Sequence, residues 1–172
     1  MGLLEDAASW HYKALACCDE WSDKTSPTAL KNRVISLNGI GNIHLSMGND
    51  EVAMSAFREA LRGETVLGSA TGMAINYANI GALLEESGLT DSARWYYTES
   101  LKCNEESGNA LGIALCYNHF GRLSEAEGDN EGALAEYGKA YDILTGTKDK
   151  WHWLQSCTAE PQAQGHNRSQ DN

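Results

Sequence analysis

The 172-residue sequence contains only two prolines, Pro27 and Pro161, and no long apolar run. Because proline interrupts helices, the stretch between these two positions is free to be helical. No segment approaches the roughly 20 apolar residues that a membrane helix needs. The length is that of one domain with a sizeable core. The composition therefore predicts a soluble, mostly helical domain.

Basic residues are scarce: 13 Lys and Arg stand against 24 Asp and Glu, which gives a net charge of -11. Most of the acidic excess lies between Gly81 and Asp142. Such a surface repels nucleic-acid phosphates and anionic lipids, so we expect neither nucleic acid nor membrane as a partner. A protein or peptide rich in Lys and Arg is the complementary partner. Acidity that serves only solubility is the alternative.

The five cysteines are an odd number, without a Cys-x-x-Cys motif or a Cys/His ligand spacing. This pattern predicts neither a disulfide framework nor a zinc site, and we expect reduced thiols. The N-terminal residues MGLLEDAASW carry acids where a signal peptide needs bases. The expected location is the cytoplasm.

The five histidines do not recur with nucleophiles or carboxylates at any catalytic spacing. His44 is expected at an inner packing position of a helix, and His119 is the only histidine expected on the face where a ligand would bind. We therefore predict no enzyme activity, no catalytic residue, no cofactor and no metal site.

A repeat with a period of 40 residues runs through the middle of the chain. The segment IGNIHLSMGNDEVA (residues 40–53) returns as IGALLEESGLTDSA (80–93) and as FGRLSEAEGDNEGA (120–133). Two glycines and one alanine keep their places in all three copies: Gly41, Gly81 and Gly121; Gly48, Gly88 and Gly128; Ala53, Ala93 and Ala133. A period between 20 and 50 residues indicates stacked structural units.

Each unit has the pattern of a helix hairpin. In the second unit one apolar stripe ends at Gly88 and another follows it, with helical spacing in both. The glycine suits the left-handed conformation that ends a helix. Asp50, Thr90 and Asn130 are expected as the N-caps of the second helices. Glycine inside the first helix, at Gly41 and its counterparts, costs about 1 kcal/mol and indicates a close crossing there.

This register of small and large residues resembles the tetratricopeptide repeat family. The first copy carries it as Leu37, Ile40, Gly41, His44, Gly48, Ala53, Phe57 and Ala60; the others as Tyr77, Ile80, Gly81, Leu84, Gly88, Ala93, Tyr97 and Ser100, and as Tyr117, Phe120, Gly121, Ser124, Gly128, Ala133, Tyr137 and Ala140. The departures are the period of 40 instead of 34 and the residues that replace a usual Tyr, namely His44, Leu84 and Ser124. The resemblance implies an all-α, right-handed superhelical solenoid of antiparallel helix hairpins.

The resemblance also implies a division of the chain into one repeat domain over residues 1–160. A half repeat over 1–20 matches the second-helix register through Ala7, His11 and Ala14. Repeats are expected at about 30–66, 70–106 and 110–146, then a capping helix at about 149–160 and a disordered tail over 161–172. The open half repeat indicates either pairing through its flank or a fragment of a longer array.

In this family the first helices line a concave groove that binds peptides. The resemblance implies that this groove carries the following candidate side chains: Asn38, Asn42, Asn79, Glu85, Glu86, Asn118, His119, Arg122 and Glu125. The apolar residues Ile35, Leu45, Ile75 and Leu115 are expected on the same face. The asparagines would bind a peptide backbone, Arg122 a carboxylate, and the glutamates Lys or Arg. Alternatively, the asparagines bridge helices and the acids are merely solvated.

The predicted function is a non-catalytic protein–protein interaction module. The variant of this family that binds the C-termini of chaperones uses a Lys where this chain has Asn38. Binding of chaperone C-termini is therefore disfavoured. Two alternatives remain: a homo-oligomer that stacks through the N-terminal half repeat, and a regulatory fragment of a larger signalling protein.

Overall fold

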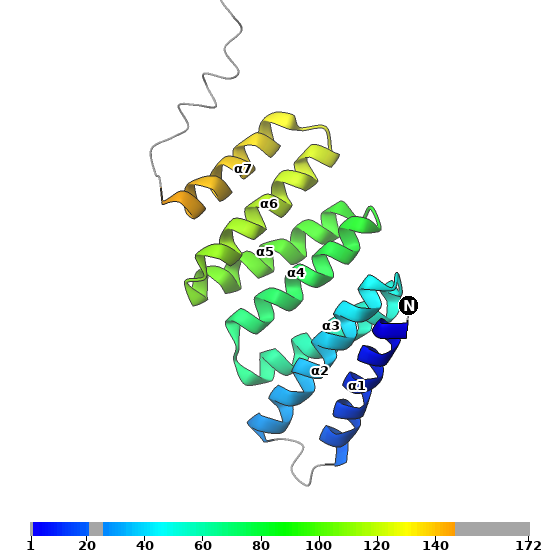
Figure 1. Ribbon diagram of the computed structural model, residues 1–172. Coiled ribbons are helices and arrows are strands. Elements are labelled where there is room, and N and C mark those ends of the chain that lie inside the picture. Colours follow the sequence, from blue (N-terminus) through cyan, green and yellow to red (C-terminus); the bar gives the residue numbers. More distant parts are fainter. Residues whose placement is uncertain (1, 21–25, 147–172) are drawn as a thin grey trace, which may run out of the picture.

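The computed structural model describes residues 2–20 and 26–146, and these residues form helices and no strand. The helices are α1 (Gly2–Glu20), α2 (Pro27–Ser46), α3 (Asp50–Leu67), α4 (Ala70–Glu86), α5 (Thr90–Ser107), α6 (Ala110–Ala126) and α7 (Asn130–Thr145). Figure 1 shows them stacked in chain order from α1 at one end to α7 at the other. The expected capping helix and tail lie outside the described residues. Among the helices described, none is both long and apolar enough to span a membrane.

Three helix hairpins, α2–α3, α4–α5 and α6–α7, form the stack, and each helix contacts the next one along the chain. The first helix of each hairpin ends at a left-handed glycine: φ is +73° at Gly48, +74° at Gly88 and +81° at Gly128. Only glycine adopts this conformation without steric cost. The predicted all-α solenoid of antiparallel hairpins and its glycine turns are confirmed.

The second helices begin one residue earlier than the expected N-caps imply. Their N-caps are Asn49, Leu89 and Asp129, so the prediction of Asp50, Thr90 and Asn130 was wrong by one position. The carbonyl of each observed N-cap accepts the first helical hydrogen bond, as from the Ala53 N–H to Asn49 at 3.1 Å. Of the three side chains only Asp129 caps its helix, where it accepts a hydrogen bond from the Gly132 N–H at 2.9 Å.

The glycines inside the first helices allow an aromatic ring to approach the backbone. A Cβ atom at Gly41 would lie less than 3.0 Å from the ring of Phe57, and the same holds for Gly81 with Tyr97. Gly121 stands in the same relation to Tyr137. The close crossing predicted from the sequence is confirmed, and it is made by a ring from the second helix of the same hairpin.

The same rings also join one hairpin to the next. Phe57 and Ala53 of α3 form a buried cluster with Ile80 and Leu83 of α4. Tyr97 and Ala93 of α5 pack in the same manner on Leu123 of α6. A ring at this repeat position therefore fixes both the hairpin and the stacking of hairpins, which places the first helices beside one another.

Candidate functional site

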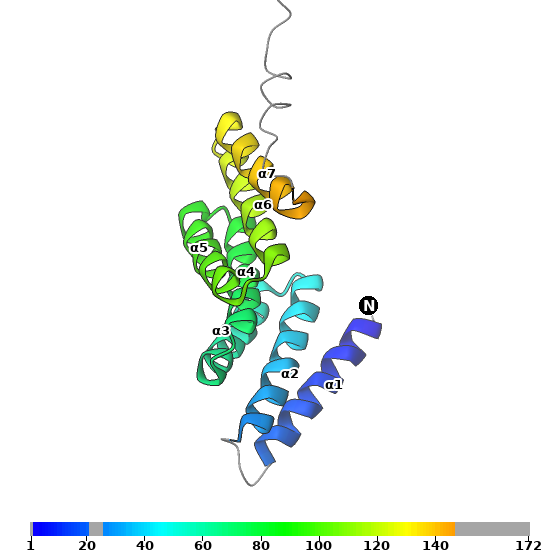
Figure 2. The ribbon, with the colours of Figure 1, turned by 90° about the vertical axis from the view of Figure 1, so that its left-hand side faces the viewer.

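The first helices of the hairpins form one face of the molecule. Figure 2 shows α3 and α5 on one side of α2 and α4. Helices α4 and α6 contact each other although a hairpin partner separates them in the chain. Side chains that point away from the second helices on α2, α4 and α6 therefore share a surface.

An apolar side chain stands at the same position of each first helix on this surface. Ile35 is 56% exposed, Ile75 is 52% exposed and Leu115 is 50% exposed. Their spacing of 40 residues is that of the repeat, so they hold equivalent positions on the three first helices. We call these three residues the groove stripe. Large apolar side chains that are exposed in a contiguous row are typical of binding surfaces.

A pocket of about 290 Å³ lies between α4 and α6 beside the groove stripe. Its walls include Ile75, Asn79, Leu115 and His119, and α5 contributes Ser100 to it. Ser100 is buried and donates a hydrogen bond to the Ala74 carbonyl at 2.8 Å. The structure thus brings two predicted site residues, Asn79 and His119, into a cavity large enough for one apolar side chain.

Glu85 lies at the centre of a polar cluster where the second and third hairpins meet. Its carboxylate accepts a hydrogen bond from the Tyr97 hydroxyl at 2.6 Å. It also forms an ion pair with Arg122, whose Nη2 is 2.8 Å away. The ring of His119 stacks on Tyr97 with centroids 4.2 Å apart, and its Nδ1 lies 3.8 Å from Glu85. Glu85 and Arg122, which the sequence offers as separate ligands for opposite charges, therefore bind each other.

Burial favours the neutral forms of His119 and Tyr97 in this cluster. It lowers the pKa of His119, an effect that Glu85 opposes and Arg122 reinforces. It also raises the pKa of Tyr97, as do the hydrogen bond and the charge of Glu85. Tyr97 therefore remains a hydroxyl donor at neutral pH, and His119 remains an uncharged ring.

The other candidate residues differ in their exposure to solvent and in their hydrogen bonds. Glu125 is exposed and accepts a hydrogen bond from the Tyr137 hydroxyl at 3.0 Å. Asn42 and Glu86 are exposed, whereas Asn38, Asn79 and Asn118 are half-buried. The side-chain oxygen of Asn38 is buried, with no hydrogen-bond partner among the residues described.

One pairing could have been found in the sequence. The residue twelve positions before each conserved ring is Leu45 for Phe57, Glu85 for Tyr97 and Glu125 for Tyr137. A ring with a hydroxyl thus accompanies a carboxylate, and a ring without one accompanies a leucine. Both Tyr–Glu hydrogen bonds are present in the structure. The ion pair of Glu85 with Arg122 has no such signal, because it joins different repeats.

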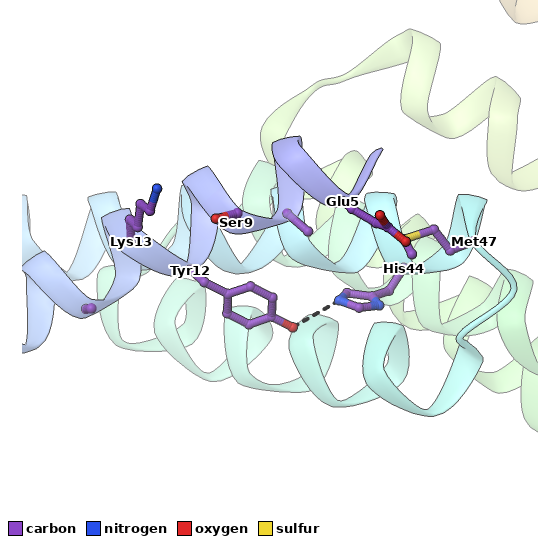
Figure 3. A pocket seen from close by; sticks show the side chains of 8 residues that line it. Glu5, Ser9, Tyr12, Lys13, His44 and Met47 are labelled. Carbon is purple, nitrogen blue, oxygen red and sulfur yellow. Dashed lines mark hydrogen bonds between the residues drawn. The ribbon is translucent and has the colours of Figure 1, made fainter. Parts of the chain in front are cut away.

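His44 is half-buried beside an open pocket. Its Nδ1 accepts a hydrogen bond from Asn49 Nδ2 at 3.3 Å, and its Nε2 is 3.0 Å from the Tyr12 hydroxyl (Figure 3). It lines an open pocket of about 540 Å³ between α1 and α2. The ring therefore has polar partners and is only half-buried, and it does not lie in the closed core that the sequence predicts.

The described part of the chain has no metal site among its His, Cys, Asp and Glu side chains, and its cysteines are not paired. No group of three His, Cys, Asp or Glu side chains comes together there as a metal site. Cys17, Cys18, Cys103 and Cys116 are free thiols, and burial raises the pKa of Cys103 and of Cys116. The two buried thiols are therefore protonated at neutral pH.

Comparison with known proteins supports the architecture. Residues 34–70 match the family model described as tetratricopeptide repeat. A search of the curated proteins found no match. Among solved structures, BtubC from P. vanneervenii is 19% identical with a TM-score of 0.68, and the match covers 84% of this chain and 58% of BtubC.

Two further structures share the fold. The TPR domain of Arabidopsis FLU is 24% identical with a TM-score of 0.62, over 68% of this chain and 98% of that domain. The apo form of RapI is 16% identical with a TM-score of 0.73, over 86% of this chain and 40% of RapI. The chain thus spans little more than half of BtubC and less than half of RapI. Residues 34–70 thus match one tetratricopeptide repeat, and the solved structures show that the chain shares the helical-repeat solenoid fold, here with a period of 40 residues.

Proposed function

We propose that the chain is a non-catalytic protein–protein interaction module, which binds a partner segment along the groove of α2, α4 and α6. The observation that carries this proposal is the groove stripe. Ile35, Ile75 and Leu115 recur in phase and are each half-exposed, whereas apolar residues of the core on the same helices, such as Ile40 and Ile80, are buried. Covering such a row with a partner releases water from apolar surface, which favours association.

The polar ends of the groove favour a partner segment that carries Lys or Arg. Glu86 and Glu125 lie in the last turns of α4 and α6 and are exposed. The negative ends of the two helix dipoles add to these charges. Glu85 contributes less than its sequence position indicates, since Arg122 neutralises it. The preferred segment therefore places apolar side chains on the groove stripe and basic side chains toward Glu86 and Glu125.

The chemistry of the polar cluster supports binding rather than catalysis. Glu85 already accepts a hydrogen bond from Tyr97 and forms an ion pair with Arg122, so its carboxylate is occupied within the protein. Tyr97 is completely buried, and its raised pKa makes it a poor general base. Free, protonated thiols at Cys103 and Cys116 suit a reducing compartment, and we place the protein in the cytoplasm.

Selection from a library of random 15-residue peptides displayed on phage tests this proposal. We expect the selected peptides to combine apolar residues with Lys or Arg. Replacing Ile75 and Leu115 together by Asp should weaken binding of a selected synthetic peptide at least tenfold, because charge disrupts the apolar row. Glu86→Lys combined with Glu125→Lys should weaken it less and only for basic peptides.

Val66→Asp is the matched control, since Val66 is an apolar residue of α3 that is 78% exposed. It should leave the affinity unchanged. Circular dichroism confirms that each variant folds. Selected peptides that bind the Ile75/Leu115 variant as tightly as the original protein would contradict the proposal.

A further inference from the structure

Helix α1 carries an exposed apolar face that none of the other described helices covers. The face consists of Leu3, Ala7, Trp10, Ala14 and Cys17, spaced alternately by four and three residues along one side of the helix. Leu3 is 86% exposed and Trp10 is 69% exposed. Helix α2 packs on a neighbouring side of α1, where Ala8 is buried and Leu15 is half-buried. We call these five residues the α1 face.

The structure shows what covers the corresponding face in a complete hairpin. The ring of His11 lies against Gly39 as the ring of Tyr97 lies against His119, so α1 occupies the position of a second helix. In α3 the residues that match Ala7, Trp10, Ala14 and Cys17 are all buried: Ala53, Ala56, Ala60 and Gly63. The antiparallel helix α2 covers them, with Val34 against Ala60 and Gly63. No described helix takes this place beside α1, which ends the stack (Figure 1).

We propose that the α1 helix of a second copy of this chain covers the α1 face, antiparallel to it, as the first helix does in each hairpin. The face is complementary to itself in this orientation. When Trp10 lies opposite the partner's Ala7, Leu3 lies opposite the partner's Ala14. Each large side chain then meets a small one on the facing helix, which is how helix surfaces interlock.

Charges along the rim fit the same alignment. Asp6 and Lys13 lie on one flank of the α1 face, and both are exposed. Lys13 Nζ stands 4.4 Å from the centre of the Trp10 ring, so its charge is at the edge of the apolar row. In the antiparallel pair Asp6 lies near the partner's Lys13, and the symmetry of the dimer forms this ion pair twice.

The α1 face continues into the groove stripe. Ala14 and Cys17 share a pocket of about 310 Å³ with Ile35, the first residue of the groove stripe. A dimer through α1 would therefore join two grooves end to end. A segment long enough to follow both could bind two chains at once, with a gain in overall affinity that neither groove provides alone.

Light scattering after size-exclusion chromatography of the full chain tests the dimer. We expect a species of twice 18.7 kDa that dissociates on dilution. Trp10→Glu should yield a monomer at every concentration, because it inserts two charges into the apolar row. Trp95→Glu is the matched control, since Trp95 is a 55% exposed tryptophan on α5, and it should leave the dimer intact.

A charge reversal tests the orientation independently of folding. Asp6→Lys alone and Lys13→Asp alone should each weaken dimerisation about tenfold, because two attractive pairs become repulsive. Asp6→Lys combined with Lys13→Asp should restore it to within about threefold of the original. A monomer at all concentrations, a dimer that survives Trp10→Glu, or a double variant as weak as the single ones would each overturn the proposal. Cover by a helix from the same chain would give the first of these results.

Discussion

The two junctions between hairpins use the same repeat position in different ways. Between the first and second hairpins, Phe57 packs with Ala53, Ile80 and Leu83, and the contact is entirely apolar. Between the second and third hairpins, Tyr97 fills the same place but stacks on His119. It also donates a hydrogen bond to Glu85. Both rings are completely buried.

The difference shows that variable positions of a repeat need not be free to bind a partner. Leu45 and Glu85 occupy equivalent positions of the repeat. Leu45 packs against the cluster of Phe57, and Glu85 accepts a hydrogen bond from Tyr97. Arg122, which is exposed on the groove face, is paired with Glu85. The polar junction thus fixes a charge pair at the surface above it, whereas the apolar junction carries the small residue Ala82 at the place of Arg122. The groove is therefore chemically uneven along its length.

Removing the ring of the apolar junction should have the largest effect. We expect Phe57→Ala to lower the free energy of unfolding by about 3 to 5 kcal/mol, since it loses buried area and leaves a cavity between α3 and α4. Urea titration followed by circular dichroism measures this loss. Val66→Ala, at an exposed site on the same helix, should change stability by less than about 0.5 kcal/mol. Similar losses for both variants would show that Phe57 does not join the hairpins.

Removing only the hydroxyl at the polar junction should have a smaller effect. Tyr97→Phe keeps the ring but takes a donor from the carboxylate of Glu85, and we expect a loss of about 1.5 to 3 kcal/mol in the same titration. Tyr137→Phe is the matched control, because its hydrogen bond to Glu125 is exposed to water. It should cost clearly less. Equal losses at the two sites would mean that burial of the hydrogen bond contributes nothing.

Acid should weaken the polar junction through His119. Because burial lowers the pKa of His119, the unfolded chain takes up a proton near pH 6.5 that the folded chain binds only at lower pH. Stability from this group is therefore full above pH 6.5 and declines as the pH falls toward the folded pKa, by at most about 1.4 kcal/mol per pH unit.

His119→Asn removes the contribution of His119 to the pH dependence of stability. Asparagine is the residue that the apolar junction has at the equivalent position, Asn79. Urea titrations between pH 7.5 and 5.5 should show a smaller decline in stability for the variant than for the original protein. His11 and His44 are present in both and cancel in the comparison. An equal or larger decline in the variant would show that His119 is as easily protonated in the folded chain as in the unfolded one.

The sequence predicts the scaffold well because its constraints are local and recur. Gly48 ends a helix in the left-handed conformation, and Gly41 leaves room for the ring of Phe57. Both requirements return every 40 residues. The N-caps were misplaced by one residue because Asp50 and Asn49 are both acceptable caps in isolation. The turn geometry after Gly48 decides between them.

The site is less predictable because it depends on contacts between repeats. The period places Ile75 and Leu115 on one face, and both are exposed there as expected. It does not show that Glu85 reaches Arg122, since that distance depends on how α4 and α6 are inclined to each other.

Methyl NMR with a peptide selected by phage display tests the central claim, that the groove stripe is the binding surface. Titrating the labelled protein with the peptide should shift the methyl signals of Ile35, Ile75 and Leu115, while those of Val52 and Val66 on α3 should not move. Shifts at Val52 and Val66 with an unchanged groove stripe would contradict the account.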